Sequence, residues 1–450
     1  MADIQSFGAI RYDLSHVGNL ADVIAPPYDV ITPDMQRELY ERHPANIVRV
    51  ILNRIEPGDQ PDDNYARAAG FVRDWNRQGV MKQDSRPAIY VYHQQFELGG
   101  QPVVRRGFVS RVRLEPFGSG RIFPHEETHS RAKSDRLKLT RATRCNTSQI
   151  FSIYPDEQNE VMAALEAAID DRTPIQAVDD SGVVNKLWLV TDPAAISQAQ
   201  TLMGPRDLFI ADGHHRYETA LNYQAELNGG ESLAADHPAN YVSMCCVGMS
   251  DPGMIVQPTH RLWRTAPPID SAELMQRLKE TCQCSVVGNG GELAESVWQR
   301  IQADDRQSQM AFYCRKDDTW VMAEFSDAGH QRLAEAMPDR SEPWRSLGVS
   351  ILHEYLMPTA LGWQDLPTPK YVRAIDEVVD GIARGDTAGR DATGQEGTAG
   401  HFELATIVMP ATIEHVRQIS LAGERMPAKS TYFFPKLVSG LVLNPLVSSV

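Results

Sequence analysis

The fold of this chain is decided by one short stretch, Leu208-Phe209-Ile210-Ala211-Asp212-Gly213-His214-His215-Arg216-Tyr217. Its first four residues are apolar and predict a short buried strand. Gly213 predicts a turn, and from Tyr217 onward the apolar residues recur at helical spacing, at Tyr217, Ala220, Leu221 and Leu227. The sequence therefore predicts a strand, a polar turn and a helix in immediate succession.

The polar residues of this turn predict a phosphate site. A helix N-terminus carries unpaired N–H groups and a partial positive charge, and Arg216 adds a forked, permanently charged donor beside Gly213. Asp212 can accept a proton or bind Mg²⁺, and His214 and His215 can act as acids, bases or donors near neutral pH. A simpler interpretation stays open, in which Asp212 caps the helix, Gly213 permits the turn and the histidines are surface residues.

A second stretch rich in chemical groups covers residues 121–154. Residues 131–144 hold six Lys or Arg against one acidic residue. We interpret Lys133, Arg136 and His125 as ligands of phosphate, and Glu126 as a candidate catalytic carboxylate. The alternative interpretation of such a charge run is a solvated helical face.

The residues His125-Glu126-Glu127-Thr128-His129 match the H-E-x-x-H signature of zinc proteases. That chemistry requires both histidines on one face of a helix packed in a core. Pro124 precedes the motif, and apolar residues at helical spacing are missing on both sides of it. We therefore expect no zinc site here.

Two further segments are interpreted as walls of a substrate site. Two prolines fix the backbone ahead of Tyr28 and Asp29. His260 and Arg261 lie at the end of a predicted strand. A rigid loop without chemistry is the alternative for the first of these segments.

The C-terminal part combines charged, hydroxyl and aromatic residues over 426–436, among them Lys429, Ser430, Thr431 and Lys436. The residues that follow, 437–443, are mainly apolar, unlike a solvated tail. We expect the segment to fold back onto the core and to bring these four side chains to the phosphates. A closing strand with a purely structural role is the alternative.

The composition is that of a soluble globular protein, with 450 residues, 42% hydrophobic and 23% charged. A formal net charge of −15 argues against nucleic acid or an anionic membrane as a partner. No stretch approaches the length of about 18 apolar residues that spans a bilayer. The N-terminal residues show no signal peptide, so we expect a cytoplasmic protein with reduced thiols.

We predict four parts along the chain. Residues 1–265 form the core with the site, 266–384 an accessory α/β subdomain, 385–400 a glycine-rich mobile loop, and 401–450 a segment that folds back. We also expect residues 125–144, 212–216 and 429–436 to meet in one pocket.

Several of these motifs together resemble a known family, the domain of unknown function ten-fifteen. The resemblance rests on the stretches Ala25-Pro26-Pro27-Tyr28-Asp29-Val30, Pro124-His125-Glu126 with Thr128, Asp135-Arg136-Leu137, Ala142-Thr143 with Asn146 and Ser148, Ile210 to Tyr217, Pro258-Thr259-His260-Arg261, and 426–437. His129 and the glycine-rich loop depart from the family pattern.

The loop from Asp212 to Arg216 also resembles the phosphate-binding turn of the ParB/sulfiredoxin-like superfamily, which includes archaeal kinases of free serine. This resemblance implies an α+β fold, with a ParB/sulfiredoxin-like mixed core and an additional α/β subdomain. It also implies a nucleotide as ligand, ATP or ADP, with Mg²⁺.

Three functions are compatible with these residues. The first is phosphoryl transfer between a nucleotide and a small hydroxyl compound such as free serine, by a kinase that lacks a Walker A sequence. The second is hydrolysis of a phosphomonoester such as phosphoserine. The third is a nucleotide-binding protein without enzymatic activity. The sequence does not separate them, and it leaves the oligomeric state open.

Overall fold

The computed structural model describes residues 2–128, 130–169, 172–229, 233–264, 266–364, 366–385 and 400–447. The chain divides into two compact units. Unit 1 consists of Met1–Pro124, Thr128–Ile255 and Pro435–Val450, and unit 2 of His125–Glu127 and Val256–Phe434. Each unit therefore combines segments that are far apart in the sequence.

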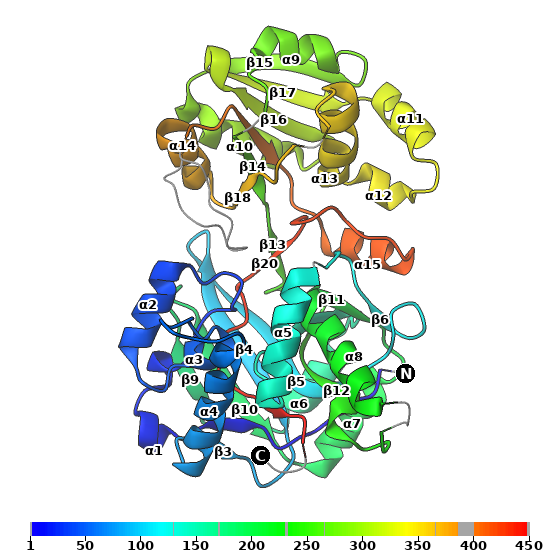
Figure 1. The fold of residues 1–450 in the computed structure, drawn as a ribbon. Coiled ribbons are helices and arrows are strands. Elements are labelled where there is room, and N and C mark those ends of the chain that lie inside the picture. Colours follow the sequence, from blue (N-terminus) through cyan, green and yellow to red (C-terminus); the bar gives the residue numbers. More distant parts are fainter. Residues whose placement is uncertain are drawn as a thin grey trace. The chain divides into compact units, whose positions relative to one another are not determined.

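Among the described residues, unit 1 is built on a mixed nine-stranded sheet of order β6-β11-β8-β12-β5-β4-β10-β9, in which β1 also pairs with β5 (Figure 1). Strand β12 runs parallel to β8, and β11 runs parallel to β6. Its strands are β1 Ile4–Gln5, β4 Ile89–Leu98, β5 Gln101–Arg113, β6 Ile122–Phe123, β8 Ile150–Tyr154, β9 Ile175–Val178, β10 Val184–Val190, β11 Leu208–Asp212 and β12 Tyr241–Gly248. Two short antiparallel pairs join β2 Ile10–Tyr12 to β3 Met81–Gln83, and β7 Cys145–Asn146 to β21 Asn444–Pro445.

The helices of unit 1 form where the sequence provides an apolar face and a cap. Thr32 caps α2 and Pro33 is its first residue, while α4 buries Val72 and Trp75. One face of the sheet packs with residues of α6, α7 and α8 in a single apolar cluster. The helices are α1 Leu14–Val17, α2 Pro33–Arg42, α3 Val48–Ile51, α4 Asp63–Arg77, α5 Ser130–Thr143, α6 Glu160–Glu166, α7 Pro193–Met203 and α8 His214–Asn228, with short 3₁₀ helices at Leu20–Asp22 and Pro238–Asn240.

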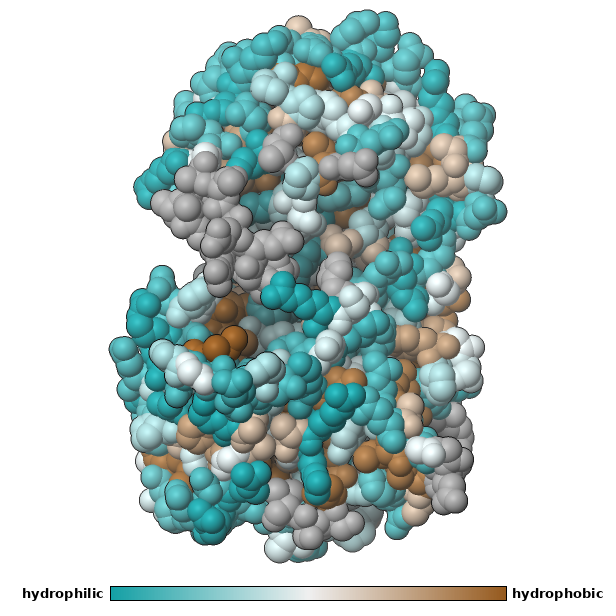
Figure 2. All heavy atoms as spheres, viewed as in Figure 1, coloured by the Kyte–Doolittle hydropathy of each residue, from teal (hydrophilic) through white to brown (hydrophobic). Residues whose placement is uncertain are grey.

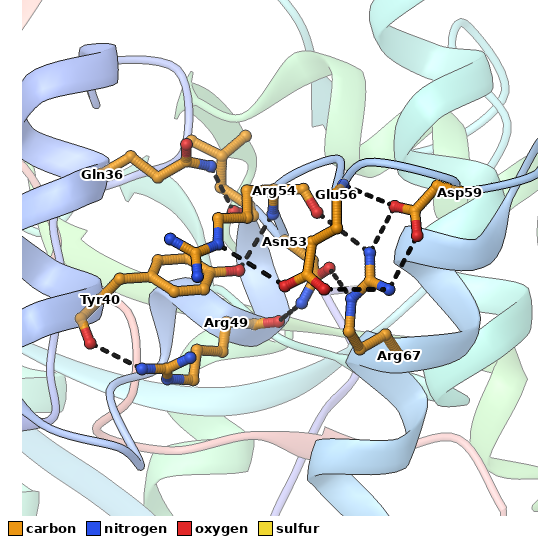
Figure 3. A network of polar contacts seen from close by, with 9 residues as sticks. Gln36, Tyr40, Arg49, Asn53, Arg54, Glu56, Asp59 and Arg67 are labelled. Atoms are coloured by element: carbon orange, nitrogen blue, oxygen red, sulfur yellow. Dashed lines mark hydrogen bonds and ion pairs between the residues drawn. The ribbon is translucent and has the colours of Figure 1, made fainter.

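A polar network joins α2, α3 and α4 (Figure 3). Arg67 of α4 forms an ion pair with Asp59 at 2.5 Å. The guanidinium groups of Arg49 and Arg54 both lie 4.4 Å from the ring centroid of Tyr40. The network fixes the short helix α3 against the two longer helices, and α3 in turn contacts a residue of the candidate site described below.

The C-terminal residues of unit 1 are buried. The main chain of Leu443 exchanges two 2.9 Å hydrogen bonds with Ile10, and the side-chain amide of Gln149 donates to the Val442 carbonyl at 2.6 Å. Residues 437–446 are buried throughout. This segment is thus part of the core of unit 1.

Unit 2 contains, within its described residues, an antiparallel six-stranded sheet of order β15-β17-β16-β19-β14-β18 (Figure 1). Its strands are β14 His260–Trp263, β15 Cys282–Asn289, β16 Gln309–Cys314, β17 Thr319–Phe325, β18 Lys370–Val372 and β19 Leu404–Val408, and a separate pair joins β13 Ile255–Gln257 to β20 Tyr432–Phe434. The helices are α9 Ser271–Leu278, α10 Ala294–Asp304, α11 Asp327–Ala336, α12 Glu342–Ser346, α13 Gly348–Ser350, α14 Ile375–Arg384 and α15 Ile413–Leu421, with short 3₁₀ helices at Gly291–Leu293 and Arg315–Asp317 and a π-helix at Ile351–Ala360.

The prediction of a mixed α and β fold is confirmed, whereas the ParB/sulfiredoxin-like core and the domain limits stay predictions. Most of the predicted loop 385–400 lies outside the described residues, which stop at Gly385 and resume at Gly400. No helix in the described part of the chain combines the length and the apolar character that crossing a membrane requires. Hydrophilic residues cover most of the surface of each unit in the view of Figure 2, as expected for a chain of this charge.

Candidate functional site

The strand-turn-helix predicted around Asp212 is present, with one difference. Asp212 ends β11, Gly213 adopts φ 95° and ψ 28°, and α8 begins directly at His214. His214 and Arg216 therefore lie in the first turn of the helix instead of on a loop before it. The side chain of His214 is buried, which explains why the helical pattern starts three residues earlier than the apolar residues indicated.

The carboxylate of Asp212 lies between cations. Arg216 donates from Nη2 to Oδ2 of Asp212 at 3.0 Å, and Lys436 donates from Nζ to Oδ1 at 3.3 Å. The side chains of Arg216 and Lys436 are each 15% exposed. Arg216 also donates to the Gln149 carbonyl, which fixes its guanidinium over Gly213.

A third cation, Arg105 of β5, lies within electrostatic range of Asp212. It is fully buried, and its guanidinium lies 4.6 Å from the ring centroid of Phe151. It donates to the carbonyl of Pro435 and to Oε1 of Gln94. The side-chain amide of Gln94 donates in turn to the carbonyl of Lys436 at 3.0 Å, so Arg105 and Gln94 together hold the backbone that carries Lys436.

Burial lowers the pKa of Arg105 to about 10, and nearby acidic groups oppose that shift, first Cys245 and Tyr92 and then Asp251 and Asp212. Arg105 therefore stays charged at neutral pH. Two cationic side chains thus contact the carboxylate of Asp212, and a third lies within electrostatic range of it at the end of β11.

A polar cavity opens beside this cluster. It opens to solvent, and its enclosed space is small, with a volume of about 30 Å³. Arg216 lines the cavity and also donates to Asp212. The other lining residues come from five segments of unit 1, namely Tyr28, Arg136, Leu139, Thr140, Cys145, Asn146, Thr147, Ser148, Ile150, Thr219, Ala220 and Val242.

Arg136 and Tyr28 form one wall of the cavity. The guanidinium of Arg136 lies 4.0 Å from the ring centroid of Tyr28 and donates to Asp135 and, at 2.7 Å, to the carbonyl of Ile51 in α3. Burial raises the pKa of the Tyr28 phenol, while Arg136 and Arg216 both oppose that shift. Both guanidinium groups thus act on the same phenol. Asp29, predicted beside Tyr28, is exposed.

Lys133 has a different partner from the one predicted. Its Nζ lies 2.6 Å from Oε2 of Glu218, whose other oxygen accepts from Thr128 at 2.9 Å. This pair joins α5 to α8. The assignment of Lys133 to phosphate stays a prediction.

In unit 2, residues of the predicted site form a second cluster. His125 Nε2 lies 3.0 Å from Thr431 Oγ1, and Oε1 of Glu126 accepts from the backbone N–H of Lys429 at 3.2 Å. Ser430 donates to the carbonyl of Pro427 at 2.6 Å. Lys429 has φ 58°, and its carbonyl accepts from Arg261 at 3.1 Å. The catalytic role predicted for Glu126 is not tested by these contacts.

His260 and Arg261 are fully buried in unit 2. Arg261 donates to Nε2 of His353 at 3.0 Å, so that nitrogen of His353 is an acceptor. Burial and, second, the charge of Arg261 lower the pKa values of His260 and His353 to about 3. The hydrogen bond from Arg261 to the Lys429 carbonyl holds the loop that carries Lys429. A place in a substrate wall stays a prediction for His260 and Arg261.

The zinc motif has no helical geometry over its described residues. Residues 125–128 are extended or irregular, and Glu126 forms a parallel β-bridge with Met426. His129 lies outside the described residues. Across the described chain, no group of three His, Cys, Asp or Glu side chains is placed to hold a metal ion. Asp212 alone does not fit a Mg²⁺ site as it stands, because both of its oxygens contact cations.

Within unit 1, the structure brings together Asp212, Arg216 and Lys436, and it places Arg136 on the cavity that Arg216 lines. The sequence reasoning did not identify Arg105 or Thr219. Asn146 and Ser148 line the cavity as well, and a signal for them existed, because both residues carry the family resemblance.

The comparisons with known proteins identify one family. The family model described as "Protein of unknown function (DUF1015)" matches residues 4–350. Three solved structures similar to this chain are a free serine kinase variant in complex with ADP (11% identity, 70% of this chain and 84% of that chain, TM-score 0.31), a conserved hypothetical protein from Pyrococcus furiosus (11%, 72% and 91%, 0.31) and C-terminally truncated SbnI from Staphylococcus aureus (9%, 75% and 87%, 0.32). No curated protein matches the chain.

Proposed function

The chain belongs to the DUF1015 family, and we propose that it is a phosphotransferase that moves a phosphoryl group between a nucleotide and a small hydroxyl compound. The observation that carries the proposal is the placement of Asp212 between Arg216 and Lys436 at the N-terminus of α8, beside a polar cavity. The proposal rests on these side chains and not on the similarity to solved structures.

The cations are suited to phosphate oxygens. Phosphoryl transfer requires mainly positioning and neutralisation of charge. Arg216 offers a planar fork of donors and Lys436 a mobile point charge, and the N-terminus of α8 adds partial positive charge. A phosphate that enters would take over part of their contact with Asp212. Mg²⁺ would arrive bound to the phosphates of ATP or ADP and supply further neutralisation.

Asp212 is the proposed proton acceptor. The oxygen of the acceptor hydroxyl forms a bond to the terminal phosphorus, and the bond from phosphorus to the leaving nucleotide oxygen breaks. The hydroxyl proton moves to the carboxylate oxygen of Asp212 that Arg216 or Lys436 has released. General-base assistance of this kind contributes roughly 10²–10⁴ in rate. His214 and His215 are proposed to orient the transferring group.

A phosphorus NMR time course tests this function. The purified chain is mixed with Mg²⁺, serine and either ATP or ADP, and a parallel sample receives phosphoserine without nucleotide. The matched variants are Asp212→Asn and the control Asp207→Asn, whose carboxylate forms a partly exposed ion pair with Arg121. We expect a phosphomonoester signal that requires nucleotide, persists in Asp207→Asn and falls by about 10²-fold or more in Asp212→Asn.

The other outcomes would reject the proposal in distinct ways. Free phosphate released from phosphoserine without nucleotide would identify a phosphomonoester hydrolase. Binding of a nucleotide without transfer of its phosphoryl group, either to serine or to other hydroxyl acceptors, would identify a binding protein. Equal activity of both variants would remove Asp212 from the mechanism.

A further inference from the structure

The cavity beside α8 contains a hydroxyl group with an unusual environment. Thr219 lines the cavity and is 2% exposed, and its Oγ1 is buried without a hydrogen-bond partner in the described part of the chain. Helical threonines usually bond to the carbonyl one turn back. Thr140 and Thr143 of α5 do so, at 2.9 and 2.8 Å. Because a buried hydroxyl without a partner is unfavourable, the cavity is expected to supply one.

Charge converges on the same space from two helices. Arg136 of α5 and Arg216 of α8 both line the cavity, and both stabilise the ionised form of the Tyr28 phenol. Arg136 is held rigidly by Asp135, by the carbonyl of Ile51 and by the ring of Tyr28. A guanidinium has five N–H donors, and the contacts with Asp135 and Ile51 use three of those of Arg136, which leaves two for an anion in the cavity.

The rest of the lining favours a small polar ligand. Thr140, Asn146, Thr147 and Ser148 contribute hydroxyl and amide groups, while the apolar part is limited to short or branched aliphatic side chains and Cys145. Among the described lining residues the one aromatic ring is that of Tyr28, and Arg136 already lies over it. A nucleobase would therefore find no free aromatic face in this cavity.

We infer that this cavity is a binding site for the oxyanion group of a small polar molecule, with Arg136 and Arg216 on the anion and Thr219 as a further donor. The chemistry is shared by a carboxylate-bearing hydroxyl compound and by free phosphate. The inference deepens the proposed function and rests on it in one respect. In the proposed reaction, the carboxylate-bearing hydroxyl compound would be the acceptor of the phosphoryl group. Binding itself requires no turnover.

The test is calorimetric titration in the absence of nucleotide with four probes: L-serine, glycerate, inorganic phosphate and glycerol. Thr219→Val removes the hydroxyl at nearly constant volume, and Arg136→Lys keeps the charge but removes the guanidinium with its remaining N–H donors. The controls are Thr201→Val, whose hydroxyl bonds back within α7, and Arg141→Lys, whose guanidinium forms an exposed pair with Glu226. Thermal unfolding of each variant shows whether the fold persists.

We expect the anionic probes to bind and glycerol not to bind. Thr219→Val and Arg136→Lys should each weaken anion binding by about tenfold or more, the loss expected for a charge-assisted hydrogen bond, and the two controls should not. Thr219→Val should unfold at the same or a higher temperature than the unmodified chain, because it removes a buried hydroxyl without a partner.

Each outcome has a definite meaning. Binding of glycerate or serine supports a carboxylate acceptor, and binding of phosphate alone supports a phosphate subsite. Equal binding of glycerol, no binding of any probe, or unchanged affinity in both cavity variants would overturn the inference. Binding that persists while the phosphorus NMR experiment shows no transfer would reject the proposed function and leave this inference standing.

Discussion

Replacing Gly213 by alanine tests two roles of this residue, its backbone conformation in the turn and the space that it leaves for Arg216. Gly213 has φ +95°, outside the left-handed region that L-residues tolerate at about +50 to +70°. A Cβ at this position would lie 2.8 Å from Nη2 of Arg216. The substitution thus strains the backbone and displaces the guanidinium that contacts Asp212.

The two effects have separate magnitudes. A left-handed L-residue costs about 1–2 kcal/mol of folding free energy. Displacement of Arg216 removes a hydrogen bond between charged groups, worth about 1.5–3 kcal/mol. Because about 1.4 kcal/mol corresponds to a tenfold change in affinity, loss of the Arg216 donor should weaken phosphate or ADP binding by about tenfold to hundredfold.

The matched control is Gly229→Ala at the other end of the same helix. Gly229 has φ +51°, and among the described residues the one atom within 4 Å of a Cβ there is the carbonyl oxygen of Leu227, at 3.9 Å. Urea unfolding should show a loss of about 1 kcal/mol for Gly229→Ala and a clearly larger loss for Gly213→Ala. Calorimetric titration with ADP should show weakened binding for Gly213→Ala alone. Equal losses of stability, with ADP affinity retained in both variants, would refute the assigned role of Arg216.

Two further predictions follow from other parts of the molecule. Lys436→Met should weaken ADP binding by about tenfold, most strongly at low salt, with little change in urea stability, whereas Lys186→Met, which removes a cation that contacts Gln95, should change neither. The folded-state pKa values of His260 and His353 are lowered to about 3, so between pH 6.5 and pH 3 the unfolded chain binds protons that the folded chain does not. The free energy of unfolding should therefore fall as pH drops below about 6.5, by up to about 1.4 kcal/mol per pH unit for each histidine. Urea unfolding at a series of pH values should show that the free energy of unfolding depends less steeply on pH in His353→Gln. The same dependence on pH in the variant would show that the pKa of His353 is not lowered by folding.

The sequence was sufficient to predict the strand and helix around Asp212, because a run of four apolar residues followed by Asp-Gly is a strong local signal. The start of α8 was placed three residues late. Its first turn consists of polar residues, of which His214 is buried, and burial of a polar side chain depends on the sheet beneath it rather than on local pattern.

The partners of the charged residues lay beyond sequence reasoning. Lys436 and Asp212 are 224 positions apart, and only the topology of unit 1 brings them together. Arg105 precedes a second arginine on β5, and no local signal distinguishes the fully buried side chain from its neighbour Arg106. The lack of a hydrogen-bond partner for the Thr219 hydroxyl among the described residues is likewise a property of packing, since Thr140 and Thr143 of the neighbouring helix have the same side chain and are hydrogen-bonded.

The contacts of Asp212 bear directly on the proposed ligand. Lys436 and Arg216 approach the same carboxylate in a chain of formal net charge −15, and Arg105 lies within electrostatic range of it. Burial lowers the pKa of Arg105, so holding this cation inside unit 1 has a cost in stability. Functional sites typically accept such costs because their groups serve a ligand. An anion with more than one negative oxygen would contact Arg216 and Lys436 at once, as the phosphates of a nucleotide would.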